Sequence, residues 1–302
     1  MPETRANGIT IAYEQYGDGQ EAPIVLLQGL SMPLNAWPPA FIDRLTDAGH
    51  PVLVMDNRDI GKSETFHQFG IPNLAWQVVK DRVGLPVARA YSLADMAADV
   101  NGLMASLGLA SAHVAGVSMG GMIAQTLAIR FPARVRSLTS IMSTTGNRRL
   151  PKPSSEITRL MLSRPSTADN DARIAHSMKL WRLISSKGFG VDYDLVEKRL
   201  RDMYARGVSR GGVIRQMLAI GTAKSRVKAL RKLDVPTLVI HGSEDPLVPP
   251  AGGVDTADAI PNAKLEIIEG MGHALAPGLI DRLTGLLLDH VAEVERSPRA
   301  AA

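Results

Sequence analysis

Short, almost wholly apolar runs recur along the chain and predict buried β-strands. The runs cover residues 24–28 (IVLLQ), 51–55 (PVLVM), 112–117 (AHVAGV), 137–142 (SLTSIM), 237–241 (TLVIH) and 264–268 (KLEII). A more polar run at residues 9–16 (ITIAYEQY) suits a strand at the edge of a sheet. Because most of the runs are apolar throughout instead of alternating, we expect a sheet that is covered on both faces.

Helical patterns separate several of these strands, and the clearest covers residues 93–107. Its apolar side chains recur at steps of three and four residues, and Ser92 and Asp95 have the spacing of a capping box at its start. Alternating strands and helices predict the α/β class, with a mostly parallel sheet of about eight strands flanked by helices. Ligands are then expected at the carboxyl ends of the strands.

The alternation stops at residues 146–231, where several helical patterns but no convincing strand pattern appear. We interpret this segment as a helical cap inserted after the sixth strand, into a core domain formed by residues 1–145 and 232–302. A second insertion, residues 64–91, is rich in proline and aromatic residues. It could be a surface excursion or could help to wall a pocket, and the sequence leaves both interpretations open.

Composition narrows the class of protein. The chain has 302 residues, of which 45% are hydrophobic and 21% are charged, as in an ordinary globular protein. It lacks the run of roughly 18 apolar residues that a membrane span needs, and it begins without a signal-peptide pattern. We therefore expect a cytoplasmic protein. The absence of cysteine excludes disulfides and thiolate nucleophiles.

Charge gives little indication of a macromolecular partner. The net charge is only +4, and the densest basic group, residues 224–232 (KSRVKALRK), alternates with apolar residues as on the solvated side of a helix. We therefore expect no nucleic-acid partner. The oligomeric state, monomer or homodimer, stays open.

The string GVSMGG carries the strongest chemical signal. It follows the strand run AHVAG and precedes the helical pattern MIAQTLAIRF, so Ser118 lies on a strand-to-helix turn. At so sharp a turn the serine backbone is strained, and side chains two positions away would collide, which Gly116 and Gly120 avoid. The hydroxyl lies at a helix N-terminus, which favours negative charge. This context predicts a nucleophile instead of a plain glycine-rich turn.

A serine hydroxyl needs a base to take its proton and an acid to orient that base. Among the seven histidines, His273 differs because it lies in a Gly-flanked loop, EGMGHAL, directly after the last strand. Asp245 follows the strand TLVIHG and lies between Ser118 and His273 in the chain, which is the order expected for the acid. The side chain of its neighbour, Glu244, is expected to point in a different direction. We expect Ser118, Asp245 and His273 to form a catalytic triad.

Attack on a carbonyl places negative charge on its oxygen, which backbone amides can stabilise. We expect the amides of Met119, next to the nucleophile, and of Leu30, in the turn after the first buried strand, to form this oxyanion hole. Met32, Trp37 and Trp181 are candidates for the wall of an apolar pocket. The chain has no H-E-x-x-H, no Cys–His cluster, no GxGxxG after the first strand and no Walker loop, so neither a metal nor a cofactor is expected.

The motifs LLQG, DNRDIGKS, GVSMGG, HGSEDPLVP and GMGHAL, in this order, cover nearly the whole chain and resemble the α/β-hydrolase superfamily. QGLSMPLNAWP, DNRDIGKSE, WRLISSKG and EGMGHAL look most like the bacterial esterases typified by aclacinomycin methylesterase. The resemblance implies a Ser–Asp–His triad at Ser118, Asp245 and His273. One departure is that Gln28 stands where many relatives have histidine at the oxyanion turn.

A serine nucleophile on this fold predicts a carboxylic ester hydrolase that works through an acyl-enzyme. The expected substrate, and the only expected partner, is a small to medium apolar ester, such as a polyketide-type methyl ester or a lactone. A carbon–carbon bond hydrolase or lactonase with the same triad is the alternative, because catalytic residues do not encode the scissile bond. A non-catalytic ligand receptor of the same fold is a more remote alternative.

Overall fold

A computed structural model describes residues 2–163, 169–186 and 188–296. Its centre is an eight-stranded sheet with the strand order β1-β2-β4-β3-β5-β6-β7-β8. The strands are β1 (Glu3–Ala6), β2 (Ile9–Tyr16), β3 (Ile24–Leu27), β4 (Val52–Met55), β5 (Ala112–Val117), β6 (Val135–Ile141), β7 (Thr237–Gly242) and β8 (Lys264–Ile268). Strand β2 is antiparallel to β1 and β4, and the other neighbours are parallel, which confirms the predicted mostly parallel sheet.

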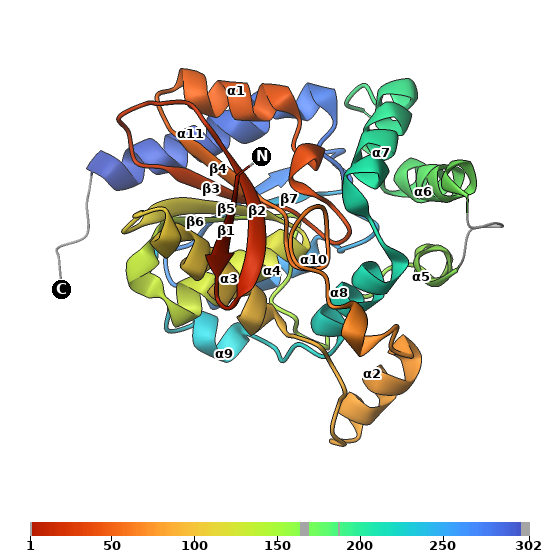
Figure 1. Cartoon of the computed structure of the whole chain (residues 1–302). Helices are drawn as coiled ribbons and strands as arrows, with labels where there is room; N and C mark the ends of the chain where they lie inside the picture. Colours follow the sequence, from red (N-terminus) through yellow and green to blue (C-terminus); the bar gives the residue numbers. More distant parts are fainter. Residues whose placement is uncertain (1, 164–168, 187, 297–302) are drawn as a thin grey trace.

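Helices cover both faces of this sheet (Figure 1). One face carries α1 (Pro39–Asp47) and α11 (Ile280–Arg296), and the other carries α3 (Leu93–Ser106), α4 (Met119–Arg130), α9 (Val227–Leu230) and α10 (Ala251–Ala259). Alternate side chains of β3 pack on opposite faces of the sheet. Val25 and Leu27 pack in the core with α3 and α4. Ile24 and Leu26 pack in the core with α1. Burial on both faces explains why the central strands β3 and β4 are apolar throughout, whereas the edge strand β8 is largely exposed.

The helix predicted at residues 93–107 forms as α3. Its start is held by the predicted capping box, in which the Ser92 amide donates to Asp95 Oδ2 at 2.8 Å. Its buried stripe includes Leu93, Met96 and Val100, which pack in the same core as β3 and α4. The position of α3 therefore follows from its apolar spacing and its cap.

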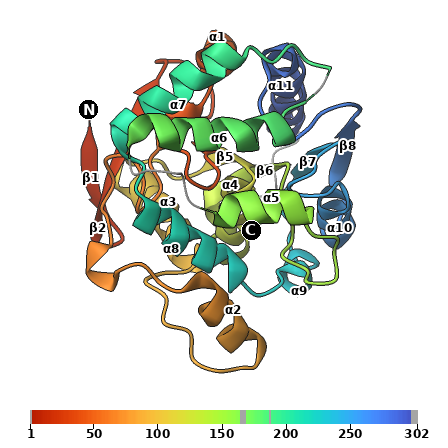
Figure 2. The ribbon, with the colours of Figure 1, turned by 90° about the vertical axis from the view of Figure 1, so that its right-hand side faces the viewer.

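Between β6 and β7 the chain leaves the sheet and forms four consecutive helices, which we name the cap helices. They are α5 (Ser155–Leu162), α6 (Asn170–Ile184), α7 (Tyr193–Gly207) and α8 (Arg210–Gly221). In Figure 2 they lie in front of the sheet, over the edge at which its parallel strands end. Ile174 and Met178 of α6 pack with Leu200 and Met203 of α7 in a small separate core. The next helix, α9, packs against α4 and α10 instead.

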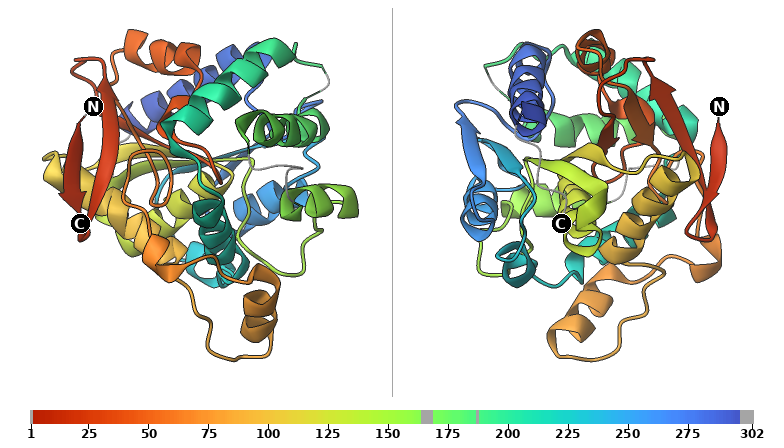
Figure 3. Two further views of the ribbon diagram at one scale, coloured as in Figure 1. Left: turned by 45° about the vertical axis from the view of Figure 1, so that its right-hand side comes forward. Right: turned by 90° about the vertical axis from the view of Figure 1, so that its left-hand side faces the viewer.

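The insertion at residues 64–91 contains α2 (Leu74–Arg82), which extends from the body of the molecule and packs against α8 (Figure 3). Several of its apolar side chains, including Ile71 and Trp76, are more than half exposed. Among the residues described, no helix has the length and apolar character needed to cross a membrane.

Candidate active site

Ser118 lies at the sharp turn between β5 and α4. Its φ is 54° and its ψ is −117°, a conformation that an L-residue adopts only when the surrounding structure imposes it. The Ser118 amide donates to Ile141 O at 2.9 Å, and Ser143 Oγ donates to Ser118 O at 2.7 Å. The end of β6 thus holds the strained turn in place and presents the Ser118 side chain to the cap.

Two glycines make this turn sterically feasible. A Cβ on Gly116 would lie 2.2 Å from Gly120 O, and a Cβ on Gly120 would lie 2.0 Å from Leu27 O. Both distances are far below van der Waals contact, and the clashing atoms are backbone atoms that cannot rotate away. The prediction that both positions must be glycine is confirmed, and its reason is the close packing of α4 against β3 and β5.

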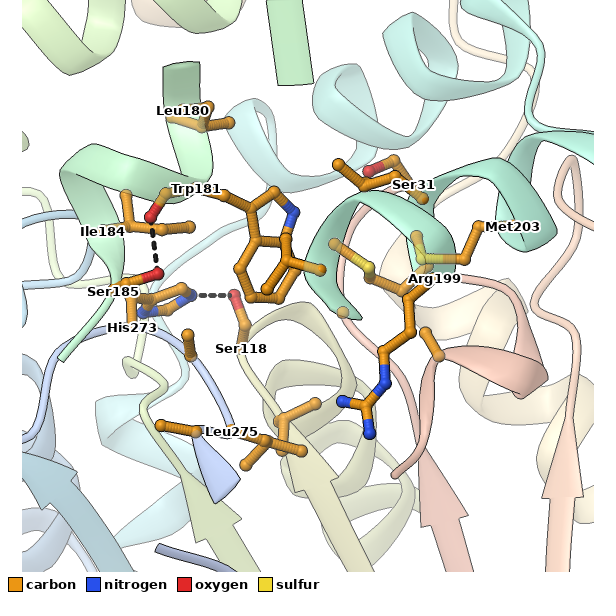
Figure 4. Close-up of a pocket in the computed structure, with 18 of the residues that line it drawn as sticks. Ser31, Ser118, Leu180, Trp181, Ile184, Ser185, Arg199, Met203, His273 and Leu275 are labelled. Atoms are coloured by element: carbon orange, nitrogen blue, oxygen red, sulfur yellow. Dashed lines mark hydrogen bonds between the residues drawn. The ribbon is translucent and has the colours of Figure 1, made fainter. Parts of the chain in front are cut away.

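The structure brings the three predicted side chains together. His273 stands in the loop after β8, and its Nε2 lies 3.0 Å from Ser118 Oγ, the contact drawn in Figure 4. Its Nδ1 lies 2.6 Å from Oδ2 of Asp245, which stands in the loop after β7. His273 is 7% exposed and Asp245 is 3% exposed. Loops from three different strands therefore meet at one point of the carboxyl edge of the sheet.

Asp245 is held as an ionised acceptor. Its Oδ1 accepts the amides of Leu247 and Val248 at 2.9 and 2.8 Å, and its Oδ2 lies 3.4 Å from Nε2 of His241. Burial raises the pKa of Asp245, but the charge of His273 and the hydrogen bonds from His241, His273 and Val248 outweigh it and lower this pKa to about 2. An ionised Asp245 accepts a hydrogen bond from the Nδ1–H group of His273 and so keeps that proton on Nδ1, which leaves Nε2 free to accept the proton of Ser118.

His241 also contacts Asp245, a role that the sequence does not reveal because a histidine within a strand pattern indicates an ordinary core residue. Its Nε2 lies 2.7 Å from Val248 O, which can only accept, so the proton resides on Nε2. The same N–H is thereby aimed towards Asp245. The Asp245 oxygen that it faces, Oδ2, is the one that also contacts His273, and the hydrogen bond from His241 helps to lower the pKa of Asp245.

The turn after β3 lies directly against Ser118. A Cβ on Gly29 would be 3.3 Å from Ser118 Cβ, and the next residue, Leu30, lines the cavity beside Ser118. Met119 begins α4 on the other side of the nucleophile. Among the described residues, neither the Leu30 nor the Met119 amide donates a hydrogen bond, so both remain free for a ligand oxygen. Amides next to the nucleophile that have no acceptor of their own are one requirement of an oxyanion hole.

A cavity of about 150 Å³ opens beside Ser118 and His273, between the strand ends and cap helices α5, α6 and α7. Its lining is mostly apolar and includes Met32 and Trp181, two of the predicted wall residues. Trp181 is labelled in Figure 4. The prediction for Trp37 is wrong. This side chain is 2% exposed and packs in the core beneath α1, with its ring 5.1 Å from that of Phe41. Residues 64–91 do not line the cavity.

The cap is hydrogen-bonded to the loop that carries His273. The His273 amide donates to Ile184 O at 2.7 Å, and the Gly272 amide donates to Ser186 Oγ at 2.8 Å. Both acceptors belong to the end of α6 and the residues after it. The position of His273 therefore depends on the cap as well as on the sheet.

The motif DNRDIGKS anchors the other side of the cap. Asp56 lies 2.8 Å from the Arg206 guanidinium of α7, and Asp59 lies 2.6 Å from that of Arg215 in α8. Asp56 Oδ1 also accepts the amide of Leu34 at 2.7 Å, which connects this anchor to the turn after β3. Two buried ion pairs thus fix α7 and α8 over the sheet, a role that the sequence alone does not show because the partners lie far apart in the chain.

The cavity also contains a cation that the sequence does not single out. Arg199, on α7, lines it together with Ser118 and His273. Over residues 2–163, 169–186 and 188–296, no group of three or more acidic or histidine side chains is placed to hold a metal ion. The polar groups in and beside this cavity include Ser118, His273 and its partner Asp245, the amides of Leu30 and Met119, and the Arg199 guanidinium.

Comparison with known proteins agrees with this geometry. The model of the alpha/beta hydrolase fold family matches residues 22–276. The chain is 29% identical to rhodomycin D methylesterase DnrP of Streptomyces peucetius, over 93% of this chain and 95% of that protein. It is 26% identical to a 2-hydroxy-6-oxononadienedioate/2-hydroxy-6-oxononatrienedioate hydrolase of Paraburkholderia phymatum, over 94% and 92% of the two chains. The structure of the meta-cleavage product hydrolase CumD of Pseudomonas fluorescens IP01 has a TM-score of 0.74 at 22% identity, covering 97% and 98% of the chains, and shows the shared fold.

Proposed function

Because the chain belongs to the alpha/beta hydrolase fold family, we propose that it hydrolyses carboxylic esters through a triad of Ser118, His273 and Asp245. The observation that carries the proposal is the continuous chain of contacts from Ser118 Oγ to His273 at 3.0 Å and on to Asp245 at 2.6 Å. Similarity to a methylesterase over nearly the whole length of both chains supports ester cleavage.

In the proposed mechanism, His273 Nε2 takes the proton of Ser118 while Oγ attacks the ester carbonyl. The negative charge that develops on the carbonyl oxygen is bound by the amides of Leu30 and Met119. Asp245 stabilises the imidazolium that forms, and His273 then gives its proton to the departing alcohol. Water, deprotonated by His273, hydrolyses the acyl-enzyme and restores Ser118. The bond from Ser118 Oγ to the acyl carbon forms as the alcohol leaves and breaks as water adds, the acid is released, and every proton passes through His273.

The cavity indicates the size of the group that binds beside Ser118. Its volume of about 150 Å³ is close to that of an engineered cavity that binds benzene. Together with the apolar lining from Met32 and Trp181, this favours an ester with a small to medium apolar acyl or alcohol group. We propose a methyl ester as one substrate class, since rhodomycin D methylesterase is named for such an activity. The cap helices, which we regard as a separate cap domain, then set the substrate preference.

Steady-state hydrolysis of 4-nitrophenyl butyrate tests the proposal. We expect measurable turnover by the native protein and a decrease in kcat of about 10⁴-fold or more in Ser118→Ala. The exposed Ser225→Ala, in the loop before α9, serves as a matched control and should retain full activity. Equal activity of Ser118→Ala and the native protein would exclude the mechanism.

Carbon–carbon bond hydrolysis is the second candidate, because a relative at 26% identity over most of both chains carries that chemistry in its name. The same triad can serve either reaction. Turnover of a vinylogous 1,5-diketone that exceeds turnover of simple esters would favour this candidate. The reverse ranking supports the ester hydrolase.

A further inference from the structure

One arginine that lines the cavity has no partner among the residues that the structure describes. Arg199 projects from α7, one turn before Met203, and both residues line the cavity beside Ser118. Figure 4 shows the Arg199 side chain descending from the helix into this space. Within the part of the chain that the structure describes, the guanidinium forms no hydrogen bond and no ion pair.

Arginines elsewhere under the cap differ from Arg199. Arg206, on the same helix, lies 2.8 Å from Asp56, and Arg215 lies 2.6 Å from Asp59. For Arg199, burial lowers the pKa and no neighbouring charge offsets this effect. Keeping a guanidinium partly out of water without a counter-charge is unfavourable. A bound anion would remove this cost, so the site favours a negatively charged ligand group.

The cavity does not supply that anion itself. Asp192 is the only carboxylate among the lining residues, and its Oδ1 caps α7 by accepting the amides of Asp194 and Leu195, each at 3.0 Å. The remaining lining is mostly apolar. A carboxylate is the anion whose two oxygens match the planar fork of a guanidinium.

We propose that Arg199 binds a carboxylate that the substrate carries in addition to its scissile ester, so that the preferred substrates are half-esters of dicarboxylic acids. The inference rests on the proposed ester hydrolase activity. In the complex, the carboxylate pairs with the guanidinium, the ester carbonyl lies at Ser118 Oγ, and the methylene chain between them contacts the apolar lining. Arg199 is then the residue that determines specificity for the acid end.

Two esters of equal chain length test this inference: mono-4-nitrophenyl adipate, which carries a free carboxylate, and 4-nitrophenyl hexanoate, which ends in a methyl group. We expect the native protein to prefer the adipate by about 10- to 100-fold in kcat/KM, the range of one charge-assisted contact. Arg199→Met should abolish the preference while hydrolysis of the hexanoate continues. Arg199→Lys, which keeps the charge but not the fork, should retain part of it.

The matched control is Arg201→Met, two positions along the same helix. Arg201 is exposed, pairs with Asp171 and Glu197, and does not line the cavity, so the preference should be unchanged. A native protein without preference for the adipate, or an Arg199→Met variant that keeps it, would overturn the inference. Hydrolysis of neither ester would instead contradict the proposed function.

A binding experiment separates recognition from structural support. Adipate should raise the Tm of Ser118→Ala, which cannot turn over an ester, and should leave the Tm of the double variant with Arg199→Met unchanged. Because Arg199 has no partner among the described residues, Arg199→Met alone should fold with a Tm at or above that of the native protein. A lowered Tm together with no adipate effect would assign Arg199 a structural role and refute the proposal.

Discussion

The variant Asp245→Asn tests whether Asp245 is the acid of the triad, because it replaces one carboxylate oxygen by an NH₂ group and changes little else. The structure dictates how the amide must turn. Leu247 and Val248 both donate amides to Oδ1, at 2.9 and 2.8 Å, so the carbonyl oxygen of Asn must stay on that side. Its NH₂ group then faces Nδ1 of His273, where Oδ2 now lies at 2.6 Å. His273 is forced to put its proton on Nε2, and Nε2 can no longer accept the proton of Ser118.

The size of the effect follows from two losses. The charge of a carboxylate about 4 Å from the imidazolium stabilises that imidazolium by about 4 kcal/mol at an effective dielectric constant of about 20. The lost charge-assisted hydrogen bond to Nδ1 adds about 2 kcal/mol. Since about 1.4 kcal/mol corresponds to a factor of ten, kcat should fall by about 10⁴-fold. The amide contacts of Leu247 and Val248 persist, so the variant should remain folded.

The assay is hydrolysis of 4-nitrophenyl butyrate at neutral pH, with circular dichroism to verify folding. Glu244→Gln is the matched control, because Glu244 is the exposed carboxylate next in sequence and should change kcat less than twofold. A folded Asp245→Asn variant within tenfold of the native kcat would refute the assignment of Asp245 as the acid of the triad.

Three further predictions concern stability and the turn at Ser118. Arg215→Met leaves Asp59 buried without its ion-pair partner, so the free energy of unfolding in urea should fall by about 3–5 kcal/mol, and an unchanged value would contradict the role of this pair as an anchor. Gly116→Ala places a Cβ 2.2 Å from Gly120 O, so this variant should yield little folded protein in a thermal melt, and a native-like Tm would show that the turn can relax. Burial lowers the pKa of His113 from 6.5 to about 4, although Glu295 opposes the shift and Arg136 and His50 reinforce it. Because the pKa of His113 is lower in the folded protein than in the unfolded chain, keeping His113 neutral costs no stability above pH 6.5 but lowers the free energy of unfolding as the pH falls from 6.5 towards 4. His113→Asn should therefore flatten this decline. An unaltered slope of unfolding free energy against pH would contradict the prediction.

The features that the sequence predicts are those set by local pattern. Two-sided burial makes the parallel strands apolar, and the elbow needs glycine on both sides of Ser118, so both are visible in short stretches of chain. Strand β1 escaped prediction because its residues, ETRA, are mostly polar and pair only at the sheet edge with β2.

Features that depend on packing between distant segments could not be predicted in this way. Trp37 stands in a loop near the site, but its ring turns into the core below α1, and only the path of the folded chain decides between the two directions. Arg199 and Arg206 look alike in the sequence of α7, yet Arg206 reaches Asp56 and Arg199 enters the cavity. Their charge alone does not show which arginine pairs with a buried carboxylate and which lines the cavity.

The central claim is that Ser118 becomes acylated during turnover. Intact-protein mass spectrometry after rapid acid quench of the reaction with 4-nitrophenyl butyrate measures this directly, and peptide mapping locates the added mass. The account predicts one butyryl group on the peptide that contains Ser118, and no added mass in Ser118→Ala. A butyryl group on another residue, or full hydrolysis by Ser118→Ala, would contradict it.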